Sequence, residues 1–142
     1  MTSYKFPLVA DTITAEDNIA KAKWLMTNPR LTMGPLVKSY EKKWSKRVGR
    51  KYSAACSSGS TANELMACTL IESGYLKNKK VIVPSAAWVT SITPFIKLGF
   101  EPIMCEADKS NFGLDPYHLE ELLREHQPGT VMLVQVLGVP AH

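Results

Sequence analysis

Cysteine is scarce in this sequence. The 142 residues contain three cysteines, Cys56, Cys68 and Cys105, which are odd in number and widely spaced. Their number and spacing exclude a disulfide framework within the chain and a cysteine zinc site, so we expect no bound metal. Cys56 and Cys105 fall in apolar, strand-like runs, where a free cysteine packs as a small apolar side chain.

Long apolar runs are also missing. No stretch of about 18 apolar residues occurs, so the sequence predicts no membrane-spanning helix. The opening residues, MTSYKFPLVADTITAEDN, lack the apolar core of a secretory signal peptide. Together with the few cysteines, this indicates a soluble protein of the reducing cytoplasm.

Several catalytic and nucleotide-binding motifs do not occur. The sequence has no Walker loop, no GxGxxG turn and no GxSxG nucleophile motif. Its three histidines, at positions 118, 126 and 142, form no Ser/His/Asp or Cys/His constellation. These absences argue against a P-loop nucleotide hydrolase, a dinucleotide-dependent oxidoreductase and a serine hydrolase.

Acidic residues are fewer than basic ones, 13 against 17, which gives a formal charge of +4. Much of the excess lies between residues 38 and 51, where seven lysines and arginines occur. Such a cluster is typical of a solvated helix face, and it also permits binding to nucleic acid. No aromatic-rich nucleic-acid motif accompanies the cluster, which makes nucleic-acid binding the less favoured alternative. Salt-dependent binding to oligonucleotides would support it.

Helical and strand-like patterns alternate along most of the chain. The expected helices are 14–26, 36–48, 60–73, 88–99 (which Pro94 would kink) and 116–126, and the expected strands are 52–56, 80–85, 102–107 and 130–138. This alternation predicts an α/β fold with a mostly parallel sheet and helices on both faces. The last expected strand has no covering helix after it, so we expect the domain to be incomplete at its C-terminal side.

A run of small residues, Ser57 to Thr61, joins the first expected strand to the helix after it. The first N–H groups of a helix have no internal partners, and the helix dipole attracts anions to that end. Glycine allows close approach to the backbone, and the hydroxyl groups add donors. We call residues 57–61 the phosphate turn, although turns of this composition often cap a helix and do nothing more.

A tryptophan follows the next expected strand. Trp88 lies just beyond VIVPS, and ligands in parallel α/β folds bind at the carboxyl ends of strands. The residue is equally compatible with a core tryptophan at a helix start. Beside a phosphate turn, however, an indole suits a planar, phosphorylated cofactor stacked on its ring.

Five motifs in order now give a resemblance that spans almost the whole chain. They are LTMGPLVKSYEKKW, SSGSTAN, VIVPSAAWVTSITPFIKLGFEPIMCEAD, NFGLDPYHLEELL and VMLVQVLGVPAH. The chain resembles the N-terminal part of the DegT/DnrJ/StrS nucleotide-sugar aminotransferases, which are fold type I enzymes dependent on pyridoxal 5′-phosphate. The resemblance implies a lead-in segment at 1–35 and the N-terminal part of the cofactor domain at 36–142.

The resemblance also implies roles for individual residues. Gly59 and Ser60, with Thr61 as a helper, would bind the cofactor phosphate, and Trp88 would stack on the pyridine ring. Ser58 and Asn63 match the family motif but need only shape the turn. Residues 32–35 would lie on the substrate side of the site.

Two parts of the family's active site are not in this sequence. The aspartate that pairs with the pyridinium nitrogen and the Schiff-base lysine are both expected beyond His142, so we expect this chain alone to be inactive. In a whole enzyme, an amino donor and pyridoxamine 5′-phosphate would aminate a nucleotide-linked keto-sugar, in a homodimer. The TMG and SSGSTAN stretches and the tryptophan after VP also resemble the family's sugar 3-dehydratases, which are the second candidate. An inert fragment or a half that pairs with a second chain is a further alternative.

Overall fold

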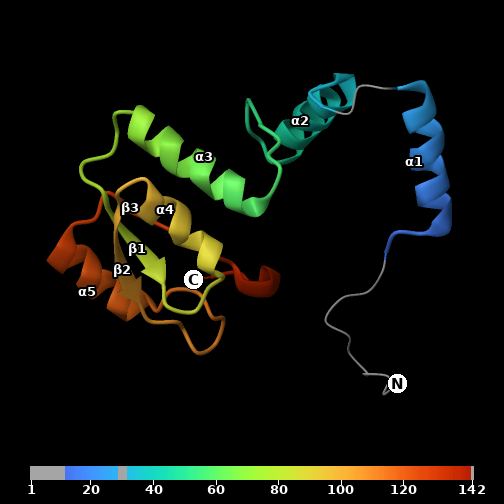
Figure 1. Ribbon diagram of the computed structural model, residues 1–142. Coiled ribbons are helices and arrows are strands. Elements are labelled where there is room, and N and C mark those ends of the chain that lie inside the picture. The colour runs from blue at the N-terminus through green and yellow to red at the C-terminus, as the bar shows by residue number, and fades with distance from the viewer. Residues whose placement is uncertain (1–11, 29–31, 142) are drawn as a thin grey trace, which may run out of the picture. The chain divides into compact units, whose positions relative to one another are not determined.

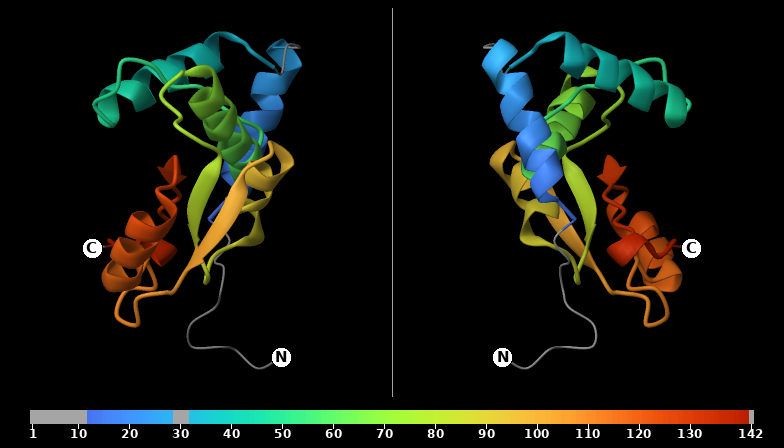
Figure 2. Two further views of the ribbon diagram at one scale, coloured as in Figure 1. Left: turned by 90° about the vertical axis from the view of Figure 1, so that its left-hand side faces the viewer. Right: turned by 90° about the vertical axis from the view of Figure 1, so that its right-hand side faces the viewer.

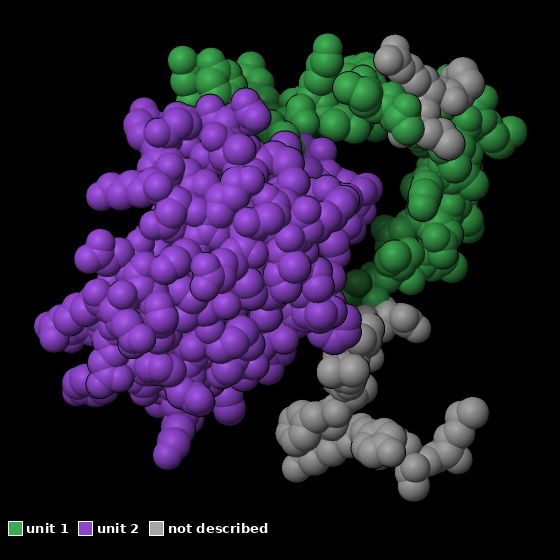
Figure 3. Space-filling model, turned by 60° about the vertical axis from the view of Figure 1, so that its left-hand side comes forward, with its two compact units in different colours: residues 1–54 green, residues 55–142 purple. Residues whose placement is uncertain are grey.

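The computed structural model describes residues 12–28 and 32–141, and it divides into two compact units, 1–54 and 55–142 (Figure 3). The helix at 35–47 belongs to the first unit, although the sequence motifs group it with the cofactor domain. The domain boundary between residues 35 and 36 therefore stays a prediction.

The described residues of the first unit form two helices, α1 (Ala15–Thr27) and α2 (Pro35–Arg47). A capping box begins α1: the Asp17 N–H donates to Thr14 Oγ1 at 3.1 Å, and the Thr14 N–H donates to Asp17 Oδ2 at 2.8 Å. These hydrogen bonds to Thr14 hold the pKa of the Asp17 carboxyl below its ordinary value. Pro35 begins α2, because a first-turn residue needs no N–H partner.

The second unit contains a three-stranded parallel sheet with helices around it (Figure 1). Its elements are α3 (Gly59–Glu72), β1 (Lys80–Pro84), the 3-10 helix η1 (Val89–Ser91), α4 (Thr93–Lys97), β2 (Glu101–Cys105), α5 (Pro116–His126), β3 (Thr130–Val131) and the 3-10 helix η2 (Val136–Gly138). The strand order is β2-β1-β3, which confirms the predicted parallel sheet. In the described part of the chain, every helix is too short or too polar to span a lipid bilayer.

β1 is buried on both faces, as its continuous apolar run indicates. Val81 and Val83 face a cluster formed with α3 and α4, whereas Ile82 faces a second cluster formed with α5. Figure 2 shows the sheet between α5 on one side and α3 with α4 on the other. The buried members are Ala67, Val81, Val83, Phe95 and Phe100 in the first cluster, and Ile82, Cys105, Leu114 and Leu122 in the second.

The strand expected at 52–56 is wrong. These residues lie outside the three strands, and Cys56 is exposed instead of packed in a strand. A strand exists only when a neighbouring strand takes up its backbone hydrogen bonds, and the small side chains here bury little apolar area. Cys105, by contrast, is fully buried at the end of β2, and its burial raises the pKa of its thiol.

Two other elements are shorter than expected. The region 88–99 is not one kinked helix but η1 followed by α4, and Pro94 lies in the first turn of α4. The strand expected at 130–138 is confirmed only at Thr130–Val131. The neighbouring strand β1 ends at Pro84, which limits how far β3 can pair with it. After β3 the chain turns through η2, where Leu137 has a φ of 53°.

Candidate cofactor-phosphate site

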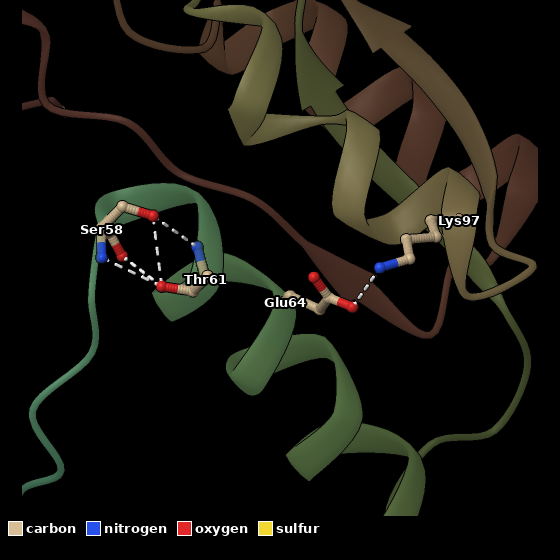
Figure 4. A network of polar contacts seen from close by, with 4 residues as sticks. All are labelled: Ser58, Thr61, Glu64 and Lys97. Carbon is tan, nitrogen blue, oxygen red and sulfur yellow. Dashed lines mark hydrogen bonds and ion pairs between the residues drawn. The ribbon is translucent and has the colours of Figure 1, made fainter.

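The phosphate turn is closed by a capping box at the start of α3. The Thr61 N–H donates to Ser58 Oγ at 3.2 Å, and the Ser58 N–H donates to Thr61 Oγ1 at 3.0 Å (Figure 4). The Thr61 hydroxyl in turn donates to the Ser58 carbonyl at 2.9 Å. The side chains of Ser58 and Thr61 are therefore committed to shaping the turn.

The next two amides remain available. Gly59 and Ser60 are the first helical residues, and neither N–H group has a hydrogen-bond partner among residues 12–28 and 32–141. Gly59 is exposed, and no atom lies within 4 Å of the position that a Cβ would take. Two unpartnered amides at the positive end of a 14-residue helix form an anion site with open access.

Trp88 is exposed at the carboxyl end of β1. It precedes η1, its carbonyl accepts the Ser91 N–H at 2.9 Å, and 77% of its surface is exposed. It is therefore not a core tryptophan, which was the alternative from sequence. The carbonyl bond to Ser91 anchors the backbone at Trp88 and leaves the indole free to pack against a ligand.

Asn63 connects the two halves of this site. Its Nδ2 donates to the Thr90 carbonyl at 2.9 Å, which joins the first turns of α3 to the segment that carries Trp88. Figure 1 shows the beginning of α3 beside the start of α4. The sequence indicated only a role in shaping the turn for Asn63. The hydrogen bond to Thr90 could not be predicted, because the two residues are 27 positions apart.

A second bond joins α3 to α4 one residue further along. Lys97 Nζ lies 2.6 Å from Glu64 Oε1, and this hydrogen bond and charge raise the pKa of Lys97 (Figure 4). Both side chains reach solvent, so the pair contributes little to stability. No sequence motif indicated this pair.

Thr61→Val is expected to destabilise the chain by about 1 kcal/mol, because the valine keeps the shape of threonine but removes the hydroxyl of the capping box. Urea unfolding followed by circular dichroism measures the change. Thr69→Val is the matched control: its hydroxyl bonds only to the Leu65 carbonyl within α3, and we expect a cost below about 0.5 kcal/mol. Equal costs for the two variants would contradict the capping role.

The remaining sequence predictions concern residues other than the phosphate turn and Trp88. Thr32 to Pro35 lie in the first unit, and their predicted position on the substrate side stays a prediction. The lysines of α2 are exposed, as expected for a solvated face. His142 lies outside the described residues.

Histidines and acidic side chains do not form a metal site in the described residues, where no three possible ligands gather. His118 has a structural contact: its Nδ1 accepts the Glu106 N–H at 3.0 Å and ties α5 to the segment after β2. His118 thus has a structural contact and no metal-ligand cluster around it in the described part of the chain.

Two curated relatives cover most of the chain. It is 33% identical over 138 residues to the GDP-4-keto-6-deoxy-D-mannose 3-dehydratase of Yersinia pseudotuberculosis, a match over 95% of this chain and 35% of the relative. It is 32% identical over 119 residues to the enzyme of the same name from Escherichia coli, over 82% of this chain and 30% of the relative. The chain thus spans about a third of the length of these relatives.

Solved structures agree with the fold. The 3-dehydratase from Escherichia coli with bound hydrated PLP superposes with a TM-score of 0.80 at 30% identity, over 96% of this chain and 36% of that one. A DegT/DnrJ/EryC1/StrS aminotransferase from Brucella abortus gives a TM-score of 0.70 at 24% identity, over 88% of this chain and 34% of that one. The latter likeness concerns the fold alone.

The sequence profile of the DegT/DnrJ/EryC1/StrS aminotransferase family matches residues 12–142, which is nearly the whole chain. The resemblance inferred from the five motifs is confirmed, and so is the PLP-dependent type I fold of the second unit. The chain belongs to the DegT/DnrJ/EryC1/StrS aminotransferase family.

Proposed function

We propose that this chain supplies the cofactor-phosphate site of a PLP- or pyridoxamine-phosphate-dependent enzyme that acts on a nucleotide-linked keto-sugar. The observation that carries the proposal is the pair of unpartnered amides at Gly59 and Ser60, linked through the Asn63–Thr90 hydrogen bond to the segment with the exposed Trp88. An anion site at the start of α3, joined through Asn63 to a segment with an exposed indole, fits a phosphorylated aromatic ring.

Each residue has a distinct task in this proposal. The N–H groups of Gly59 and Ser60 donate to the phosphate oxygens, and the Ser60 hydroxyl adds a third donor. Thr61 acts indirectly, because its hydroxyl is held by Ser58 and keeps the turn closed. Trp88 packs against one face of the ring and thereby fixes its orientation. The bound cofactor supplies the electron sink for the reaction.

The reaction is either transfer of an amino group to the keto-sugar or loss of its 3-hydroxyl group. The two relatives at 33% and 32% identity are both named 3-dehydratases, which favours the dehydratase. The family name keeps the aminotransferase as the second candidate. Both reactions need a phosphate-anchored ring in the same place, so the site proposed here serves either one.

The whole protein is proposed to be a cytoplasmic homodimer, and this chain alone is proposed to be inactive. Large apolar side chains on α2 and α3 support further association: Trp44, Leu65 and Met66 are each 46–47% exposed. The Schiff-base lysine is proposed to lie outside residues 1–142. Thr32 to Pro35 are proposed to approach the substrate.

The test uses a chain in which Trp24 and Trp44 are replaced by phenylalanine, so that Trp88 is the only tryptophan. Pyridoxamine 5′-phosphate, which cannot form lysine adducts, should quench its fluorescence saturably. Pyridoxamine without the phosphate should bind at least about tenfold more weakly, because it loses the charge-assisted hydrogen bonds.

A variant that retains Trp24 in place of Trp88 provides the control and should show no saturable quenching. The proposal fails if the two ligands quench Trp88 equally, or if Trp24 responds in the same way as Trp88.

A further inference from the structure

A tight reverse turn ends α2 and directs the following residues back along the helix. The Gly49 N–H donates to the Lys46 carbonyl at 3.3 Å, and the Arg50 N–H donates to the Ser45 carbonyl at 2.8 Å. These two bonds form a Schellman motif, and Gly49 has the positive φ of 66° that the motif requires.

The returning segment and α2 line an open surface cavity of about 250 Å³. Its lining residues are Glu41, Lys42, Ser45, Lys51, Tyr52 and Ser53, all within the first unit. A cavity of this size accommodates one small charged group but not a whole nucleotide, since pockets for drug-sized ligands are larger.

The wall of this cavity is rich in cationic donors. Lys51 Nζ lies 5.1 Å from the centre of the Tyr52 ring, within the range of a cation–π contact. Within residues 12–28 and 32–141, neither Lys51 nor Lys42 takes part in an ion pair. Both lysines are therefore available to an anion.

The remaining wall residues are compatible with an anion. Ser45 is only 7% exposed, and its hydroxyl proton goes to the Lys42 carbonyl at 3.0 Å, so it holds the wall in place. Ser53 and Tyr52 contribute hydroxyl groups that can donate. The Glu41 carboxylate is the one opposing charge in the wall.

The net positive charge of the first unit further favours anion binding in this cavity. Residues 1–54 contain eleven lysines and arginines against four acidic residues, whereas residues 55–142 contain six against nine. A concave surface lined by one sign of charge concentrates ions of the opposite sign. The first unit thus provides a positive field around two unpaired ammonium groups.

We propose that the cavity between α2 and residues 51–53 binds a phosphate group, either as the free ion or as a small phosphate ester. This site is separate from the phosphate turn at 57–61 and does not rest on the proposed function.

Amide chemical shifts of the full ¹⁵N-labelled chain distinguish the two sites during titration with inorganic phosphate and with methyl phosphate. Amides of Ser45 and of residues 51–53 should shift saturably in the unmodified chain. Lys51→Gln and Lys42→Gln should each weaken this response at least about fivefold, while shifts at Gly59 and Ser60 stay unchanged. Lys43→Gln, on the same helix but outside the cavity wall, should leave both responses within about twofold.

Tighter binding of inorganic phosphate would identify the free ion as the ligand, and tighter binding of methyl phosphate would identify an ester. The proposal is overturned if phosphate shifts only residues 57–61. It is also overturned if Lys43→Gln weakens the response as much as Lys51→Gln, because the lysines would then attract phosphate through non-specific, long-range electrostatics.

Discussion

Gly59→Pro is expected to lower the affinity of the chain for pyridoxamine 5′-phosphate by about thirtyfold without unfolding α3. A hydrogen bond to a charged group contributes about 2 kcal/mol, and proline removes the Gly59 N–H that would donate it. The helix tolerates the change because Gly59 is its first residue, Ser58 before it is extended, and the space for a side chain is open. Fluorescence of Trp88 as the only tryptophan measures the affinity.

Gly59→Ala separates the loss of the donor from the gain of a side chain. Alanine keeps the N–H group, and its Cβ meets no atom within 4 Å, so affinity should stay within about threefold of the original. Circular dichroism should show the same helix content in both variants. Unchanged affinity in Gly59→Pro would remove the backbone amide from the proposed site, and an equal loss in both variants would point to steric exclusion instead.

Helix starts could be predicted from sequence because their determinants are local. Thr14, Ser58 and Asp115 each accept hydrogen bonds from N–H groups no more than three residues away. Pro35 and Pro116 add a fixed φ at the start of α2 and α5. All these signals lie within four consecutive residues, and the corresponding helices begin within a residue or two of where the sequence places them.

Strand extents could not be predicted in the same way, because a strand depends on a partner distant in the chain. β1 and β2 are confirmed, since each has a paired neighbour along its length. Residues 52–56 were expected to be a strand but lie outside the sheet, and β3 pairs only with Val81 and Ile82. Alternation of polar and apolar residues reports local burial and leaves the pairing partner undefined.

The candidate site was predictable in its parts but not in its connections. The phosphate turn and Trp88 follow from residue type and position after an expected strand. The bond from Asn63 to Thr90 spans 27 residues, and the bond from Lys97 to Glu64 spans 33. Contacts of such separation arise from packing of α3 on α4, which a single sequence does not specify.

Ile82→Ala is expected to destabilise the second unit by about 3 kcal/mol, with loss of the cofactor-phosphate site as a consequence. Ile82 is fully buried at the centre of β1, pairs with Ile103 and Val131 on its two sides, and packs in the cluster that α5 covers. Truncation leaves a cavity between sheet and helix, where rigid strands limit relaxation. Urea unfolding of the whole chain measures the cost.

Ile96→Ala is the matched control, since the same atoms are removed from a side chain of α4 that is 51% exposed. We expect a cost below about 1 kcal/mol, because little apolar surface leaves water there on folding. If Ile82→Ala costs at least about three times as much as Ile96→Ala, burial of β1 on both faces is a major contribution to the free energy of unfolding. Equal costs would mean that Ile82 contributes no more than a surface residue, and the sheet could not then be the element that positions Trp88.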